Sequence, residues 1–176
     1  RERIHLIMGK TLWKDYGLGC PDVRKEIDSK MLIVCVDQLN LGSRLIAEGT
    51  PFRLELARLN YEASKRVASL SAFVPSLEYL KRGIDLLDPK YRWTHHFDLS
   101  LEMFSAMSEM CFCAGHIEDC QKAANVVLSH SKSIDESLGA HMVLIQSLSA
   151  QAKYDEFVDM SLEVLEKLGE HIPPKP

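Results

Sequence analysis

Apolar side chains recur every three or four residues along nearly all of this 176-residue chain and hardly ever alternate strictly with polar ones. This period matches an α-helical turn, so each run presents one apolar face, and no strand pattern is present. The runs end at glycine, proline or small polar residues, which interrupt helices. Eight helices are predicted, at about 2–16, 22–39, 51–70, 73–87, 95–113, 117–130, 134–150 and 154–168.

The same period predicts which side chains form the core. The expected inner faces are Ile4, Ile7, Met8 and Leu12 in the first helix, then Ile27, Met31, Val34, Cys35 and Leu39, then Leu56, Leu59, Ala63, Val67 and Leu70, then Leu77, Leu80, Ile84 and Leu87, and in the fifth Phe97, Leu101, Phe104 and Cys111. Thr50 before Pro51 predicts an N-cap, and Ser133 with Glu136 predicts a capping box.

Three of the turns between predicted helices resemble one another, at 71–76 (SAFVPS), 115–120 (GHIEDC) and 152–157 (AKYDEF). Each has a small residue, then an apolar or aromatic residue two places on, then a helix start. This resembles the tetratricopeptide repeat, although the spacings of 44 and 37 residues depart from its ideal period of about 34. The middle copy matches the repeat best, at Phe104, Met107, Ser108, Cys111, Gly115, Cys120, Ala124 and Val127.

These observations predict an all-α fold, a right-handed α–α superhelix of degenerate tetratricopeptide-like helix pairs. We expect a single helical-repeat domain over residues 1–176, with pairs at about 2–39, 51–87, 95–130 and 134–168. The chain opens at Arg1 rather than methionine and closes on the proline-rich stretch 172–176, so we expect a fragment of a longer protein.

The run Gly9-Lys10-Thr11 ends like a phosphate-binding loop. Such a loop needs a glycine five places earlier and a strand leading into the turn, but Ile4 occupies that position. Because the surrounding apolar residues keep helical spacing, we predict one amphipathic helix here. Gly9 then indicates a close approach of a neighbouring element.

Cys111, Cys113, His116 and Cys120 have the residue types of a zinc site. Cys111 and Cys113 lie about 200° apart around a helix, however, so buried thiols and a turn histidine are the better interpretation. His95 and His96, with Asp98 nearby, diverge by about 100° for the same reason, which favours a polar helix start over acid–base chemistry. The sequence supplies no catalytic constellation, metal site or cofactor motif, and we expect no enzyme.

Composition narrows the classes of protein further. With 46% hydrophobic and 26% charged residues the chain is typical of globular domains, and it has no apolar run long enough to cross a bilayer. Five cysteines, an odd number, fit reduced thiols in a cytoplasmic setting. Residues 95–176 hold five basic and thirteen acidic residues, which disfavours nucleic-acid binding, although 51–94 carries a net +3.

Five stretches carry a resemblance beyond the generic repeat: 5–12 (HLIMGKTL), 36–46 (VDQLNLGSRLI), 56–87 (LARLNYEASKRVASLSAFVPSLEYLKRGIDLL), 97–110 (FDLSLEMFSAMSEM) and 165–176 (LEKLGEHIPPKP). They resemble the helical-repeat region of large signalling proteins. In that family a predicted signal-transduction ATPase module, often behind a serine/threonine kinase domain, precedes a tetratricopeptide-like region, and sensory and histidine-kinase domains follow. The chain departs from the repeat pattern at Phe157, at Ser161 and in the cysteine-rich end of the fifth helix.

The resemblance implies a non-catalytic segment that binds a protein or a neighbouring domain and couples it to kinase or ATPase activity. Repeat phase then predicts a partner groove lined by Arg58, Tyr61, Lys65, Glu102, Ser105, Glu109, Phe112, Met142 and Gln146. A nucleotide- or metal-binding enzyme fragment and an RNA-binding helical repeat stay as alternatives. The sequence does not name the partner or the oligomeric state.

Overall fold

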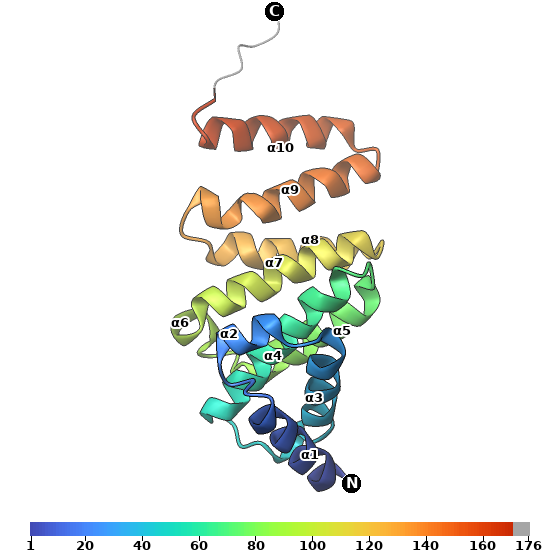
Figure 1. The fold of residues 1–176 in the computed structure, drawn as a ribbon. Helices are drawn as coiled ribbons and strands as arrows, with labels where there is room; N and C mark the ends of the chain where they lie inside the picture. Colours follow the sequence, from blue (N-terminus) through green and yellow to red (C-terminus); the bar gives the residue numbers. More distant parts are fainter. Residues whose placement is uncertain (171–176) are drawn as a thin grey trace, which may run out of the picture. The chain divides into compact units, whose positions relative to one another are not determined.

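The computed structural model describes residues 1–170, and every regular element in that range is helical (Figure 1). The described part contains ten α-helices and one short 3-10 helix, with sequential helices packed as antiparallel pairs, which confirms the all-α prediction. The chain divides into two compact units, Arg1–Met103 and the part from Phe104 onward, which are described separately. The superhelix and the single domain stay predictions.

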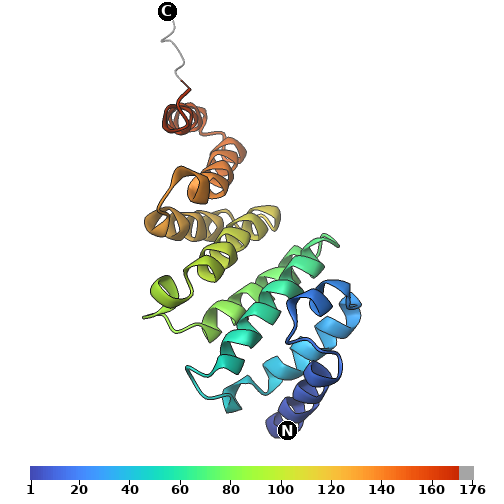
Figure 2. The same ribbon diagram turned by 60° about the vertical axis from the view of Figure 1, so that its left-hand side comes forward.

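The first unit is built by helices that pack on their neighbours in sequence. Its elements are α1 (Glu2–Asp15), α2 (Pro21–Glu26), α3 (Ser29–Leu41), η1 (Ser43–Leu45), α4 (Pro51–Ala68), α5 (Phe73–Leu86), α6 (Arg92–His95) and the first residues of α7 (Phe97–Cys113). α1 lies along α3, α3 packs on α4, and α4 packs on α5 (Figure 2). The largest fully buried side chains include Leu32, Leu39, Leu56, Leu59, Leu77 and Leu80. Burial of each stabilises the fold by roughly 1.5–3 kcal/mol.

The second unit continues α7 and adds α8 (Ile117–His130), α9 (Ile134–Ala150) and α10 (Tyr154–Lys167). α8 packs on α9, and α9 packs on α10 (Figure 1). Its buried residues are smaller than those of the first unit and include Ala124, Val127, Val143, Leu144, Leu148 and Val164.

The prediction of one helix over 22–39 is wrong, because the helix is interrupted between α2 and α3. Ile27 has an extended backbone, and the Asp28 carboxylate accepts hydrogen bonds from the backbone N–H groups of Lys30 and Met31 at 2.9 and 3.3 Å. The Arg66 guanidinium, from α4, donates to the carbonyls of Arg24 and Ile27. An N-cap and a distant arginine therefore satisfy the backbone groups that the break leaves open.

The expected inner face of α1 is wrong at three of its four residues, and the fourth, Leu12, is half-buried. Ile4, Ile7 and Met8 are 61, 57 and 49% exposed, whereas Gly9 is buried against α3. A Cβ at Gly9 would lie 2.7 Å from the Leu39 side chain and 2.9 Å from the Leu39 backbone nitrogen. The close approach predicted for Gly9 is confirmed, and it turns α1 so that Ile4, Ile7 and Met8 face outward while Leu6, Leu12 and Trp13 are half-buried.

Of the other residues predicted for the core, some are buried and others are exposed or half-buried. All four predicted residues of α5 are buried, as are the first four predicted in α4, but Leu70 lies past the end of α4 and is 74% exposed. Val34, on α3, is 47% exposed, because Leu32, Cys35, Val36 and Leu39 form the buried face instead. Cys111 is buried, while Phe97, Leu101 and Phe104 are half-buried.

The predicted helix starts need correction in detail. The predicted helix at 95–113 is preceded by the short α6, and α7 begins at Phe97. Thr50 makes no side-chain cap, because its hydroxyl donates to the Ala47 carbonyl at 2.8 Å. Ser133 does cap α9, accepting from the Glu136 N–H at 3.2 Å. The Glu136 carboxylate accepts from the Lys132 N–H at 2.6 Å, one residue earlier than the capping box predicts.

The three turns aligned in the sequence share one backbone geometry. Ser71, Gly115 and Ala152 have φ of 58, 78 and 57°, in the left-handed region. In each turn the next residue's N–H donates to the carbonyl five residues back: Ala72 to Val67, His116 to Cys111, and Lys153 to Leu148, at 3.1, 2.8 and 3.0 Å. The ψ values of these next residues are 69, 68 and 67°. The repeated turn predicted from the sequence is therefore confirmed in both units.

This geometry predicts opposite effects for two substitutions in the second unit. Ala152→Gly should stabilise the chain by roughly 1 kcal/mol, because an alanine in the left-handed region costs about that much. Gly115→Ala should destabilise it by a similar amount for the same reason, and a Cβ there meets no neighbouring atom within 4 Å that could confuse the comparison. Urea unfolding followed by circular dichroism measures both changes in the free energy of unfolding. If the two changes had the same sign, the shared turn geometry would be contradicted.

A second pair of substitutions tests the contact between α1 and α3. Gly9→Ala should destabilise the first unit by about 1–3 kcal/mol, since the added methyl group overlaps the Leu39 backbone, which cannot rotate away. Gly139→Ala is the matched control, because its Cβ meets nothing within 4 Å in α9 and alanine favours a helix by up to about 1 kcal/mol. Urea unfolding of both variants gives the measurement. A stabilising Gly9→Ala would show that α1 does not approach α3 this closely.

Candidate interaction surfaces and clefts

Three of the nine predicted groove residues, Arg58, Tyr61 and Lys65, lie on α4. Arg58, Tyr61 and Lys65 follow at intervals of three and four, so they share one side of the helix. Arg58 and Lys65 are exposed and Tyr61 is half-buried. The Lys65 ammonium lies 4.5 Å from the Tyr61 ring centroid and 2.8 Å from a Glu62 carboxylate oxygen. These contacts hold an aromatic ring and a cation in place at the surface, and together Arg58, Tyr61 and Lys65 form the α4 patch.

The other predicted groove residues lie on α7 and α9. Glu102, Ser105, Glu109 and Phe112 follow one side of α7 at intervals of three and four, and Met142 and Gln146 follow one side of α9. Glu102, Glu109, Met142 and Gln146 are exposed, while Ser105 and Phe112 are half-buried. Loss of solvent around its carboxyl group raises the pKa of Glu109. The nine residues therefore occupy three accessible helix faces, and their union in one groove stays a prediction.

The first unit contains a cleft of about 760 Å³. The sequence drew attention to two of its lining residues, His95 and His96, but did not predict the cleft. Its lining joins apolar side chains to charges of both signs and consists of Glu48, Gly49, Thr50, Pro51, Arg53, Leu54, Asp85, Leu86, Leu87, Asp88, Pro89, Tyr91, His95 and His96. Arg53 is held in place because its Nε donates to the Leu86 carbonyl at 3.1 Å. His95 contacts the Tyr91 ring and the Thr94 hydroxyl, and Asp98 is not part of this lining. The cleft therefore presents apolar, acidic, basic and imidazole groups together.

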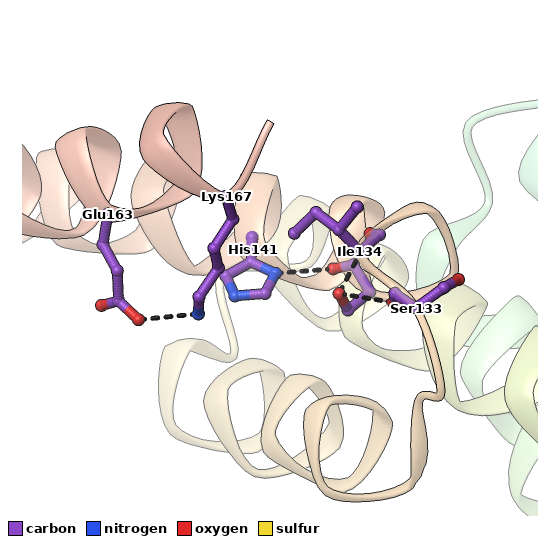
Figure 3. Close-up of polar contacts among 6 residues, drawn as sticks. Ser133, Ile134, His141, Glu163 and Lys167 are labelled. Carbon is purple, nitrogen blue, oxygen red and sulfur yellow. Dashed lines mark hydrogen bonds and ion pairs between the residues drawn. The ribbon is translucent and has the colours of Figure 1, made fainter. Parts of the chain in front are cut away.

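A second cleft, of about 540 Å³, lies in the second unit between the end of α8, the start of α9 and α10. His141 is buried there, and its Nδ1–H donates to the Ser137 carbonyl at 3.0 Å (Figure 3). The Lys167 ammonium lies 2.7 Å from a Glu163 carboxylate oxygen, and this ion pair lowers the pKa of Glu163. Sequence reasoning missed this site, because His141 and Lys167 are 26 residues apart and form no local motif.

The cysteines do not form the zinc site that their spacing resembles. Cys111 and Cys120 are buried, whereas Cys113 and His116 are exposed. Within residues 1–170, no three His, Cys, Asp or Glu side chains come close enough to hold a metal ion. Burial raises the pKa of Cys35 and of Cys120 to about 11, so both thiols are protonated at neutral pH.

The Gly9-Lys10-Thr11 run lies within α1, as predicted, and not in a strand-to-helix loop. The Lys10 ammonium lies 4.9 Å from the centroid of the Phe52 ring. No helix in the described part of the chain combines the length and apolarity needed to cross a membrane.

Thiol reactivity tests this description of the five cysteines. At pH 7.5 Ellman's reagent should modify Cys20 and Cys113 rapidly, because they are exposed, and Cys35, Cys111 and Cys120 only after denaturation in urea. Near pH 11 the difference should narrow for Cys35 and Cys120 as these two thiols ionise. A zinc chloride control should leave the rate at Cys113 unchanged, and protection of Cys113 by zinc would contradict the absence of a closed metal site.

Comparison with known proteins gives one distant relative and no assigned family. No family model matches the chain, and no solved structure matches it. The chain is 23% identical over 185 aligned residues to hybrid signal transduction histidine kinase G of Dictyostelium discoideum. The alignment covers 96% of this chain and 5% of that protein. This chain is therefore distantly homologous to a small region of a large signalling histidine kinase hybrid.

Proposed function

We propose that this chain is a non-catalytic interaction and coupling segment of a larger signal-transduction protein. In this proposal its tetratricopeptide-like helix pairs present a groove to a partner protein or to a neighbouring domain. The likeness to a region of a hybrid histidine kinase supports the signalling context. The repeated left-handed turn at Ser71, Gly115 and Ala152 supports the repeat-like pairing.

The observation that carries the proposal is the α4 patch. The Tyr61 ring and the Lys65 ammonium already contact each other at the surface, so a partner would not have to order them on binding. Tyrosine and arginine are the side chains that most often dominate the energy of protein interfaces, and this patch holds Tyr61 beside Arg58. A partner with an acidic or apolar surface would suit it.

The proposed mechanism is a shift in population between states of the parent protein. A partner that binds one state of the segment more tightly biases the attached kinase or ATPase module toward that state. Coupling of this kind typically changes affinity by about 5- to 150-fold. In this mechanism the segment binds its partner and catalyses no reaction itself.

Two measurements on the purified chain separate this proposal from the alternative classes. Calorimetric heat with ATP and magnesium would favour a nucleotide-binding enzyme fragment. Salt-sensitive retention of RNA would favour an RNA-binding repeat. The proposal expects neither, since Lys10 lies in α1 beside Phe52 and residues 95–176 are strongly acidic.

The groove is tested by changing its aromatic residues in the full-length protein that carries this chain. A photo-crosslinking amino acid at Arg58 should capture a defined partner or a neighbouring domain. Tyr61→Ala and Phe112→Ala should each lower that capture about tenfold or more, because both side chains lie at accessible helix faces and aromatic anchors dominate interfaces.

The matched control is Tyr16→Ala, which removes another accessible tyrosine, outside the predicted groove. Circular dichroism should show that all three variants stay folded. Equal capture by the wild type, Tyr61→Ala and Phe112→Ala would remove the groove assignment.

A further inference from the structure

The apolar face of α10 is wider than one neighbouring helix covers. Val164 is 4% exposed, and Phe157 and Ser161 are half-buried on the side nearest to it around the helix. Tyr154, Val158 and Leu162 follow at intervals of four and are 65, 49 and 42% exposed. They form an apolar stripe beside the buried side of α10, and we call these three residues the α10 stripe. α9 packs along α10 (Figure 1) but leaves this stripe accessible.

Carboxylates border one edge of the α10 stripe. At 100° per residue, Asp155, Asp159 and Glu166 all fall on the same side of Tyr154, Val158 and Leu162. All three acidic residues are exposed, and within the described part of the chain none of them forms an ion pair. The acidic residues farther round the helix differ, because Glu156 pairs with Lys153 at 3.9 Å and Glu163 pairs with Lys167 at 2.7 Å.

We propose that the α10 stripe docks an amphipathic helix of a partner protein, whose apolar seam is bordered by lysine or arginine. The exposed stripe runs from Tyr154 to Leu162 along α10, about 12 Å, which matches about two turns of a partner helix. The unpaired carboxylates along one edge supply charge complementarity, which selects the basic partner and fixes its register. This surface is distinct from the α4 patch and does not rest on the function proposed above.

The acidic edge also decides against an anionic membrane surface, which binds amphipathic helices through basic rather than acidic borders. A second copy of this chain offers one related surface, since the exposed Ile4, Ile7 and Met8 on α1 are bordered by Arg3, Lys10 and Lys14. Lys10 already lies over the Phe52 ring of its own chain, however, which lowers its availability. These observations favour a separate protein as the occupant, and the second copy is an outcome of the test.

Two synthetic 18-residue peptides test the surface against the whole chain. Both carry the same leucine seam, and one has lysine and the other glutamate along its edge. Fluorescence anisotropy should show at least tenfold tighter binding of the lysine-edged peptide, weakening as salt rises. Val158→Ser with Leu162→Ser should lower that affinity at least tenfold while circular dichroism stays unchanged. Equal binding of the two peptides, or binding of neither, would overturn the proposal.

Charge reversal on α10 provides the matched comparison. Asp155→Lys with Asp159→Lys should reverse the preference, so that the glutamate-edged peptide binds more tightly. Glu156→Lys with Glu163→Lys makes the same change in net charge farther round the same helix from the α10 stripe, and it should leave the preference for lysine intact. Loss of preference in both variants would show a general charge effect and overturn the site. Sedimentation equilibrium that reveals self-association, removed only by the first variant, would replace the separate partner with a second copy.

Discussion

One residue in the left-handed conformation closes each of three helical hairpins in this protein, and the packing of the helices depends on it. At Ser71, Gly115 and Ala152 the chain reverses with the same backbone hydrogen bonds and nearly the same dihedral angles. The chain therefore reverses direction in the same way at all three turns. The turns are 44 and 37 residues apart, and the longer interval contains the short helix α6.

Small residues and buried polar contacts then determine how closely the helices of the first unit approach. Gly9 allows α1 to contact the backbone of α3. Asn40 and Asn60 exchange reciprocal amide hydrogen bonds of 2.8 and 2.9 Å between α3 and α4. Arg66 reaches from α4 to the break between α2 and α3. The hydrogen bonds are directional, so they specify one register among the several that apolar packing alone would permit.

The surfaces left accessible follow from this packing. Turning α1 to fit Gly9 against α3 exposes Ile4, Ile7 and Met8, and pairing α10 with α9 leaves the α10 stripe exposed. Exposed apolar surface of this kind, beside charged residues, is typical of interaction sites. It agrees with homology to a small region of a large signalling protein, within which neighbouring segments are abundant.

The exposure of several predicted groove residues followed from the sequence, because accessibility on a helix depends on its phase, while the groove itself stays a prediction. Arg58, Lys65, Met142 and Gln146 are exposed where the period placed them. The clefts were not predictable: the one around His141 needs α8, α9 and α10 to converge, and no local spacing reports that. The broken helix at Asp28 was missed because its apolar residues keep helical spacing across the break.

The sequence by itself determined the all-α class, the helix phases and the three repeated turns, since these depend on residues close together in the chain. Only the tertiary structure decided which apolar faces are buried. Ile4 and Val34 obey the helical period as well as Leu39 does, yet they are exposed, because burial depends on how closely another helix can approach. At α1 that approach is set by the space that Gly9 leaves for Leu39, a contact between residues 30 positions apart.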